Sequence, residues 1–150
     1  MNARRIAFRR FGAVFAGLLV VVVTSTATDA VLHATGVFPP MGQPMPDSLF
    51  VLALAYRIIY AIAGGYVAAR LAPERPMWHA FALGFVGVVL ATAGTVATWD
   101  RGPEFGPHWY PVALIATSIP CSWVGGKVFC MRARGRTVAP ATPRSQANHA

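Results

Sequence analysis

Long apolar stretches alternate with short segments rich in Pro, Gly, Arg and Asp along the whole chain. Each of the four apolar stretches, about residues 11–35, 48–71, 78–98 and 112–131, is long enough to cross a bilayer as a helix. They are apolar nearly all round, whereas the helices of a soluble bundle keep one polar face. The pattern predicts an all-α protein with a four-transmembrane-helix bundle over residues 11–131.

The connections between the stretches differ in length and composition. Residues 36–47 form a Pro-rich segment without a basic residue, and residues 99–111 form a second long connection. The short segment 72–76 predicts a tight turn that makes the second and third spans antiparallel neighbours. Double glycines, Gly64–Gly65 and Gly125–Gly126, recur near the end of each half. They permit a parallel two-helix repeat, although chance recurrence of common residues is the favoured interpretation.

Charge adds an orientation to this picture. The chain has 150 residues, of which 12% are charged, and a net charge of +8. The basic residues gather in residues 1–10, in the turn at 70–75 and in residues 127–136. The positive-inside rule then places both termini in the cytoplasm, with a basic N-terminal segment at 1–10 and a disordered basic tail at 132–150. The lipid bilayer is the expected partner, and the basic ends predict attraction to anionic lipid headgroups. Nucleic acid is not an expected partner, because no aromatic or base-reading residues accompany the arginines of the tail.

The beginning of the chain permits a second interpretation. Residues 2–23 combine a basic segment with a short apolar run, as secretory signals do, and Ser25-Thr26-Ala27 offers small residues for cleavage. Apolar character resumes at Ala30 and continues to Phe38, so an uncleaved helix is the favoured prediction.

The candidate site centres on Arg57, which lies in the middle of the second span between Tyr56 and Tyr60. A cation in hydrocarbon is costly and requires a partner. Arg57 lies about 15 Å from the outer end of its helix, and Asp29 lies near the outer end of the first span. Side chains lean toward their helix N-terminus, and the two helices run in opposite directions. The sequence therefore predicts an intramembrane Arg57–Asp29 pair.

Further polar side chains share the faces of this pair. Ser25 and His33 lie four residues on either side of Asp29, and Tyr60 lies one turn from Arg57. We expect these five residues to line a polar pocket that opens outward. A structural salt bridge that fixes helix register is the favoured interpretation, and a site for an anion, a proton relay or a small polar ligand is the alternative.

Other chemistry has less support in the sequence. His33 and His108 are expected at similar depth and could together hold a metal or haem, but no ligand-spaced motif accompanies them. Cys121 and Cys130 fall on opposite faces of one helix and cannot pair with each other. No nucleophile elbow, P-loop, dinucleotide fingerprint or paired carboxylates occur. We therefore expect no cofactor, no metal site and no enzyme activity.

Small residues spaced four apart predict close helix packing. They include Gly64, Gly65, Gly84, Gly87, Gly125 and Gly126. Packing within one bundle is sufficient to explain them, and contact with a second copy or another membrane protein is an alternative. The YRxxY…GGY second span and the GPxWYP segment before the fourth resemble small four-span membrane proteins of bacterial genomes. That resemblance implies a bacterial inner membrane but no activity. We expect a structural or partner-binding membrane protein, with a subunit of a small-solute, ion or proton transporter or channel as the alternative.

Overall fold

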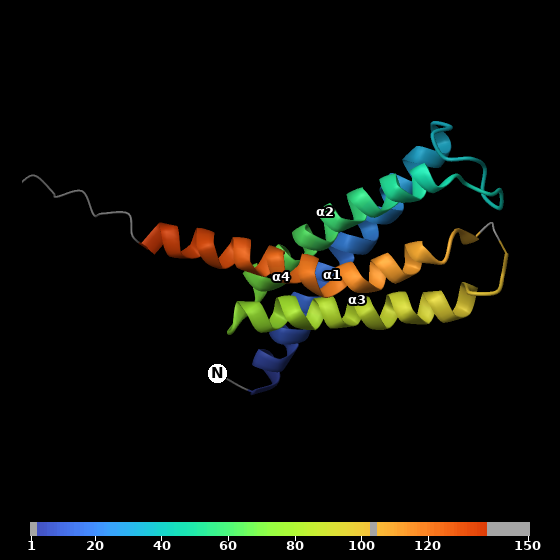
Figure 1. The fold of residues 1–150 in the computed structure, drawn as a ribbon. Helices are drawn as coiled ribbons and strands as arrows, with labels where there is room; N and C mark the ends of the chain where they lie inside the picture. Colours follow the sequence, from blue (N-terminus) through green and yellow to red (C-terminus); the bar gives the residue numbers. More distant parts are fainter. Residues whose placement is uncertain (1–2, 103–104, 138–150) are drawn as a thin grey trace, which may run out of the picture.

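A computed structural model describes residues 3–102 and 105–137 of the chain as an all-helical bundle. Its helices are α1 (Ala3–Ala34), α2 (Asp47–Leu71), α3 (Pro76–Thr98) and α4 (Trp109–Thr137). All four are long and apolar enough to cross a membrane, which indicates a membrane protein. The beginning of α1 and the end of α4 lie at one end of the bundle, and the α1–α2 and α3–α4 connections lie at the other (Figure 1). We call these the terminal end and the connection end. The side of the membrane that each end faces stays a prediction.

Two helices extend beyond their predicted spans at the terminal end. α1 begins at Ala3 rather than near residue 11, so the basic N-terminal segment is helical. α4 continues to Thr137, past the predicted boundary at residue 131. The guanidinium of Arg132 lies 5.8 Å from the centre of the Tyr66 ring, and basic residues in a last helical turn also complement the helix dipole. The remainder of the predicted tail, residues 138–150, lies outside the described residues.

The helices are not packed in chain order. α2 has its most extensive contacts with α4 and α1, and α4 also packs along α3. The short turn after Leu71 joins α2 to α3 as predicted, but their mutual contact is smaller than that between α2 and α4. α1 crosses α3 obliquely, so only part of its length lies against the rest of the bundle (Figure 1).

The two double glycines meet where α2 crosses α4. A Cβ atom added to Gly125 would overlap the Ile62 carbonyl oxygen and lie 2.6 Å from the Tyr66 nitrogen. A Cβ atom on Gly65 would lie 2.8 Å from the Cα atom of Ser122. The two backbones therefore touch directly, as small residues permit in transmembrane helices. The possible duplication of the two halves stays a prediction.

The other predicted glycines also lie at helix contacts. Gly64 faces Gly17 of α1, Gly84 and Gly87 face α4, and Gly126 faces α3. Each of the three helix pairs with the most extensive contact thus has a glycine at its interface.

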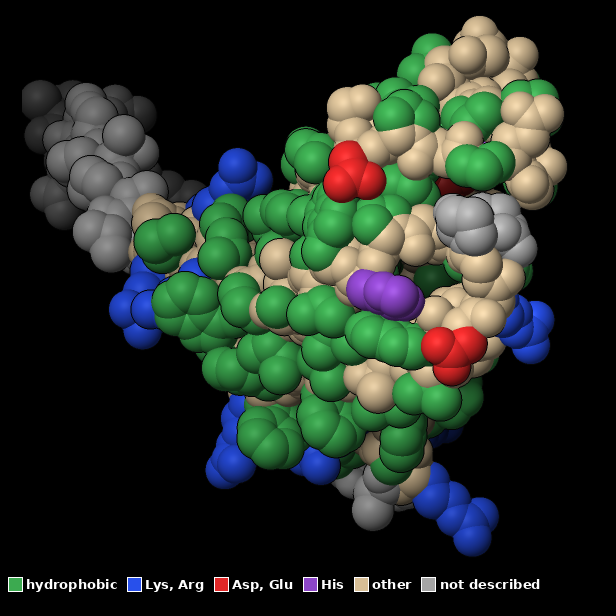
Figure 2. All heavy atoms as spheres, turned by 45° about the vertical axis from the view of Figure 1, so that its right-hand side comes forward, with side chains coloured by type: hydrophobic (Ala, Val, Ile, Leu, Met, Phe, Trp, Pro, Cys, Tyr) green, Lys and Arg blue, Asp and Glu red, His purple; other side chains and the backbone are tan. Residues whose placement is uncertain are grey.

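The outer faces of the helices carry large hydrophobic side chains. Phe15, Ile59, Phe85 and Val96 are each more than half exposed. Figure 2 shows a broad hydrophobic surface over the side of the bundle, with Lys and Arg side chains at its margins. A soluble monomer rarely exposes so continuous an apolar surface, whereas lipid chains cover it in a membrane.

Candidate functional site

The candidate site lies at the connection end and is built around an ion pair between α1 and α2. Arg57 Nη2 lies 2.6 Å from Asp29 Oδ2, a distance typical of a charge-assisted hydrogen bond. The side chains are 32% and 27% exposed, respectively. The structure therefore contains the pair that helix direction and depth predict. Its partial exposure means that the two charges are not sealed between the helices.

A second donor reaches the same carboxylate. The Tyr56 hydroxyl donates to Asp29 Oδ1, so each carboxylate oxygen accepts one hydrogen bond from α2. Tyr56 is buried and belongs to a small core with Phe38 and Ala53. The position of Tyr56 next to Arg57 in the sequence does not indicate that its hydroxyl binds Asp29. The available signal was its spacing of four from Tyr60 and eight from Gly64, which marks the face of α2 toward α1.

The ion pair lines a cavity of about 300 Å³ at the connection end. One wall is formed by Asp29 and His33 of α1, and the opposite wall by Phe50, Ala53 and Arg57 of α2. Tyr110 of α4 and the segment 38–45 of the α1–α2 connection complete the lining. We call this space the connection-end cavity. The long Pro-rich connection is thus part of the site and not only a link between two helices.

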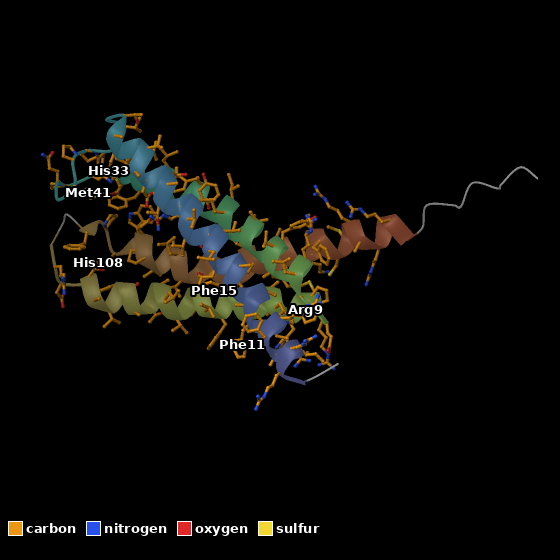
Figure 3. The ribbon with its side chains drawn as sticks, turned by 180° about the vertical axis from the view of Figure 1, so that it is seen from behind. Arg9, Phe11, Phe15, His33, Met41 and His108 are labelled. Atoms are coloured by element: carbon orange, nitrogen blue, oxygen red, sulfur yellow. The ribbon has the colours of Figure 1, made fainter. Side chains whose placement is uncertain are left out.

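Short contacts hold the connection over the cavity. The Phe38 backbone nitrogen donates to the Leu32 carbonyl at 2.9 Å, and the Phe38 side chain is buried. His33 Nδ1 lies 2.7 Å from the Pro39 carbonyl, and the His33 ring packs edge-on against Phe38. His33 and Met41 are seen at this end of the molecule in Figure 3. The role of His33 in the structure is therefore to fasten the connection.

Two of the five predicted site residues lie outside the cavity lining. The Tyr60 hydroxyl is 2.8 Å from Thr28 Oγ1, which ties α2 to α1 one turn below the ion pair. Ser25 is buried, and its Oγ has no hydrogen-bond partner among the described residues. Arg57 Nε is likewise buried without a partner in the described part of the chain. The cavity lining thus includes Asp29 and Arg57 but not Ser25.

The predicted approach of His33 and His108 is not part of this arrangement. His108 Nε2 lies 3.0 Å from the Trp99 carbonyl, and its ring stacks on Trp99 at 4.3 Å. Each histidine is therefore bound to the connection on its own side, as their separate positions in Figure 3 show. Within residues 3–102 and 105–137, no group of three or more His, Cys, Asp or Glu side chains is arranged to hold a metal.

Comparison of the chain with protein-family models, with curated proteins and with solved structures finds no match. The functional argument therefore rests on the geometry of the site. That geometry offers a carboxylate, a guanidinium and a phenol ring at the edge of one open cavity. Such a set can bind a polar or charged group, and it contains no activated nucleophile.

Proposed function

We propose that the protein is a partner-binding module of the bacterial inner membrane, with both termini in the cytoplasm and the connection-end cavity as its docking point. One observation carries the proposal: Asp29 and Arg57 form an ion pair that lines an open cavity and remains about 30% exposed. A pair that served only to fix helix register would be better covered, because water and lipid headgroups weaken an open pair. A polar segment of a partner can exchange hydrogen bonds with either charge.

The proposed role requires neither a cofactor nor catalysis. The Asp29 carboxylate is neutralised by Arg57 and also hydrogen-bonded by Tyr56, so it is a poor general base. The cavity wall contributed by the connection supplies Pro39, Pro40 and Gly42, which offer backbone carbonyls and shape but no titratable group. These features suit recognition of an extended or helical segment.

Cysteine labelling tests whether the cavity is occupied in the membrane. In a chain with Cys121 and Cys130 replaced by Ala, Gln43→Cys places a thiol at the exposed edge of the cavity. Asp100→Cys, in the other connection, is the matched exposed control outside the cavity. If a partner fills about 90% of the cavities, labelling of Gln43→Cys by an impermeant maleimide is about tenfold slower in native membranes than after purification. Asp100→Cys is labelled equally in both.

Equal labelling of Gln43→Cys before and after purification would contradict the docking role. The same reagent added to intact cells tests the orientation. Asp100→Cys is labelled if the connection end faces outward, and it is not labelled if that end faces the cytoplasm.

A second candidate, a subunit of a small-solute, ion or proton transporter or channel, is favoured by one different observation. Ser25 Oγ and Arg57 Nε are buried without partners among the described residues, and unsatisfied polar atoms mark places where water or a solute can bind. This candidate predicts flux in liposomes that Arg57→Met combined with Asp29→Leu abolishes while the bundle stays folded. Such a result would replace docking by transport as the function of the pair.

A further inference from the structure

A larger cavity of about 580 Å³ lies at the terminal end, between the beginning of α1 and the beginning of α3. It is lined by Ala7, Arg10, Phe11, Val14, Glu74, Arg75, Trp78, His79 and Ala82. It forms because α1 crosses α3 obliquely and its first turns extend past the rest of the bundle (Figure 1). We call it the terminal-end cavity. It shares no residue with the connection-end cavity.

One cation in this cavity lacks a counter-charge among the described residues. Arg10 Nη2 is 3.2 Å from Glu74 Oε2, so these two charges neutralise each other. Arg75 also lines the cavity and has no carboxylate partner within residues 3–102 and 105–137. The net charge of the lining is therefore one positive, with His79 counted as neutral. A single negative charge, such as that of a phosphodiester, would balance it.

The backbone places this cation at the beginning of α3. Arg75 has a φ of 47°, a left-handed conformation that is uncommon for a residue with a side chain. It is the N-cap of α3, and no side chain there caps the helix. Pro76 has no N–H and the Trp78 nitrogen donates to the Arg75 carbonyl, so the positive potential beside Arg75 is that of the helix N-terminus as a whole.

A buried histidine supplies a further polar group. His79 is 5% exposed and lines the cavity, and its Nδ1 lies 3.3 Å from the Arg75 carbonyl. No other hydrogen bond of the His79 ring is found in the described part of the chain. A carbonyl only accepts, so Nδ1 donates to it, and Nε2 of the neutral ring is left to accept a hydrogen bond from a group in the cavity. A buried histidine with one ring nitrogen that has no partner among the described residues distinguishes this place from the exposed arginines of the first helical turns.

The rest of the lining is apolar and faces the bilayer. Phe11 and Trp78 are 78% and 70% exposed, and Val14 and Ala82 continue the apolar wall along the two helices. Phe11 lies near the beginning of α1, at the opposite end of the bundle from His33 and Met41 (Figure 3). A soluble anion gains no stabilisation from an apolar wall, whereas the acyl chain of a lipid can pack against it. An exposed tryptophan is also typical of the membrane interface.

We propose that the terminal-end cavity binds one anionic phospholipid, with its phosphate between Arg10 and Arg75, a headgroup hydroxyl donating to His79 Nε2, and an acyl chain along Phe11 and Val14. This site differs from general attraction between basic residues and an anionic surface, because it has a defined volume and a buried polar group. It is independent of the docking role proposed for the other end.

Lipid retention by the full-length protein tests the site. The protein is purified in detergent, mixed with equal amounts of phosphatidylglycerol and phosphatidylcholine, and its bound lipid is counted by native mass spectrometry. We expect one phosphatidylglycerol to be retained at least about tenfold more than phosphatidylcholine. Arg10→Gln with Arg75→Gln removes that preference. Arg4→Gln with Arg5→Gln removes the same amount of charge from the same end of the bundle, and it should keep the preference for phosphatidylglycerol because neither residue lines the cavity. Equal loss in both double variants would show attraction without a site and overturn the proposal.

Two further experiments test the headgroup and the acyl chain separately, and circular dichroism checks that the variant is folded. Ala82→Phe fills the apolar part of the cavity without changing charge, so we expect the retained lipid to fall while helical circular dichroism stays unchanged. Unchanged retention would refute the placement of the chain. Glycerol phosphate at millimolar concentration should not displace the lipid. Displacement by glycerol phosphate, or equal binding of inorganic phosphate, would identify a site for a soluble anion and refute a lipid site.

Discussion

The Asp29–Arg57 pair gives the most direct quantitative test of how this bundle is held together. Asp29 accepts hydrogen bonds from Arg57 and Tyr56, so removal of either charge leaves the other in a largely apolar environment. Arg57→Met leaves the carboxylate with the Tyr56 hydroxyl alone. Asp29→Leu leaves the guanidinium without a counter-ion. The double variant leaves neither charge and keeps similar volume.

The partial exposure of the pair sets the magnitude. Breaking a fully buried ion pair costs about 3–5 kcal/mol, and the opening at the connection-end cavity reduces this to about 2–3 kcal/mol for each single variant. The double variant should lie within about 1 kcal/mol of the natural chain, because no charge is left unpaired. The coupling energy of the cycle is then about 3–6 kcal/mol. Tyr56→Phe should cost about 1.5–3 kcal/mol, the range for one hydrogen bond to a charged acceptor.

Unfolding in mixed micelles measures these values. The purified chain in a mild detergent is titrated with dodecyl sulfate, and loss of tertiary structure is followed by tryptophan fluorescence. The Arg10–Glu74 pair is a matched control in the same protein, since its side chains are 52% and 51% exposed. Its cycle should give less than about 1 kcal/mol. A double variant of Asp29 and Arg57 that loses as much stability as the two single variants together would refute the coupling, and with it the pair as a fastening between α1 and α2.

Three other predictions concern the packing, the connection and the first helix. Gly125→Leu should keep the α2 and α4 backbones apart and abolish the folded species in size-exclusion chromatography. Gly12→Leu should behave as the natural chain, because no atom lies within 4 Å of a Cβ added there, and equal behaviour of the two variants would contradict the crossing. His33→Ala removes the contact with the Pro39 carbonyl, so amide hydrogen exchange in residues 36–46 should accelerate by about tenfold while exchange in α2 and α4 stays the same. Unchanged exchange in residues 36–46 would show that His33 does not fasten the connection. Intact mass of the purified protein should equal that of the full chain, because cleavage after Ala27 would remove Gly17 from its contact with α2; a product beginning at Thr28 would contradict this.

The sequence predicts the helices and the ion pair because both depend on local quantities. Span length and apolar character identify four helices, and helix direction with depth brings Asp29 toward Arg57. The third member of the cluster, Tyr56, was missed. Counting residues on the Arg57 face favoured Tyr60, but the long guanidinium reaches Asp29 from a neighbouring face while Tyr56 points at α1 directly.

The extent of the cavity could not be predicted in the same way. Ser25 shares the face of Asp29, and face counting therefore placed it in the pocket. In the structure Ser25 lies one helical turn from Asp29 toward the beginning of α1, and it is not part of the cavity lining. The connection that closes the cavity follows no helical or strand period, so its fold over Phe38 is a consequence of tertiary contacts that periodicity does not encode.

The glycine contacts explain why both cavities lie at the ends of the bundle. Gly64 and Gly65 bring α2 against α1 and α4 within the same turn, where no larger side chain fits. Helices that touch at one crossing point and meet at an angle must separate on either side of it. The spaces so created are too wide for small residues to fill, and the chain fills them with longer polar side chains, Arg57 at one end and Arg75 at the other. The two arginines differ in one respect that matters for the two proposals: Arg57 is neutralised by Asp29, whereas Arg75 has no carboxylate partner among the described residues. The close middle of the bundle and its two open polar ends are therefore consequences of a single packing arrangement.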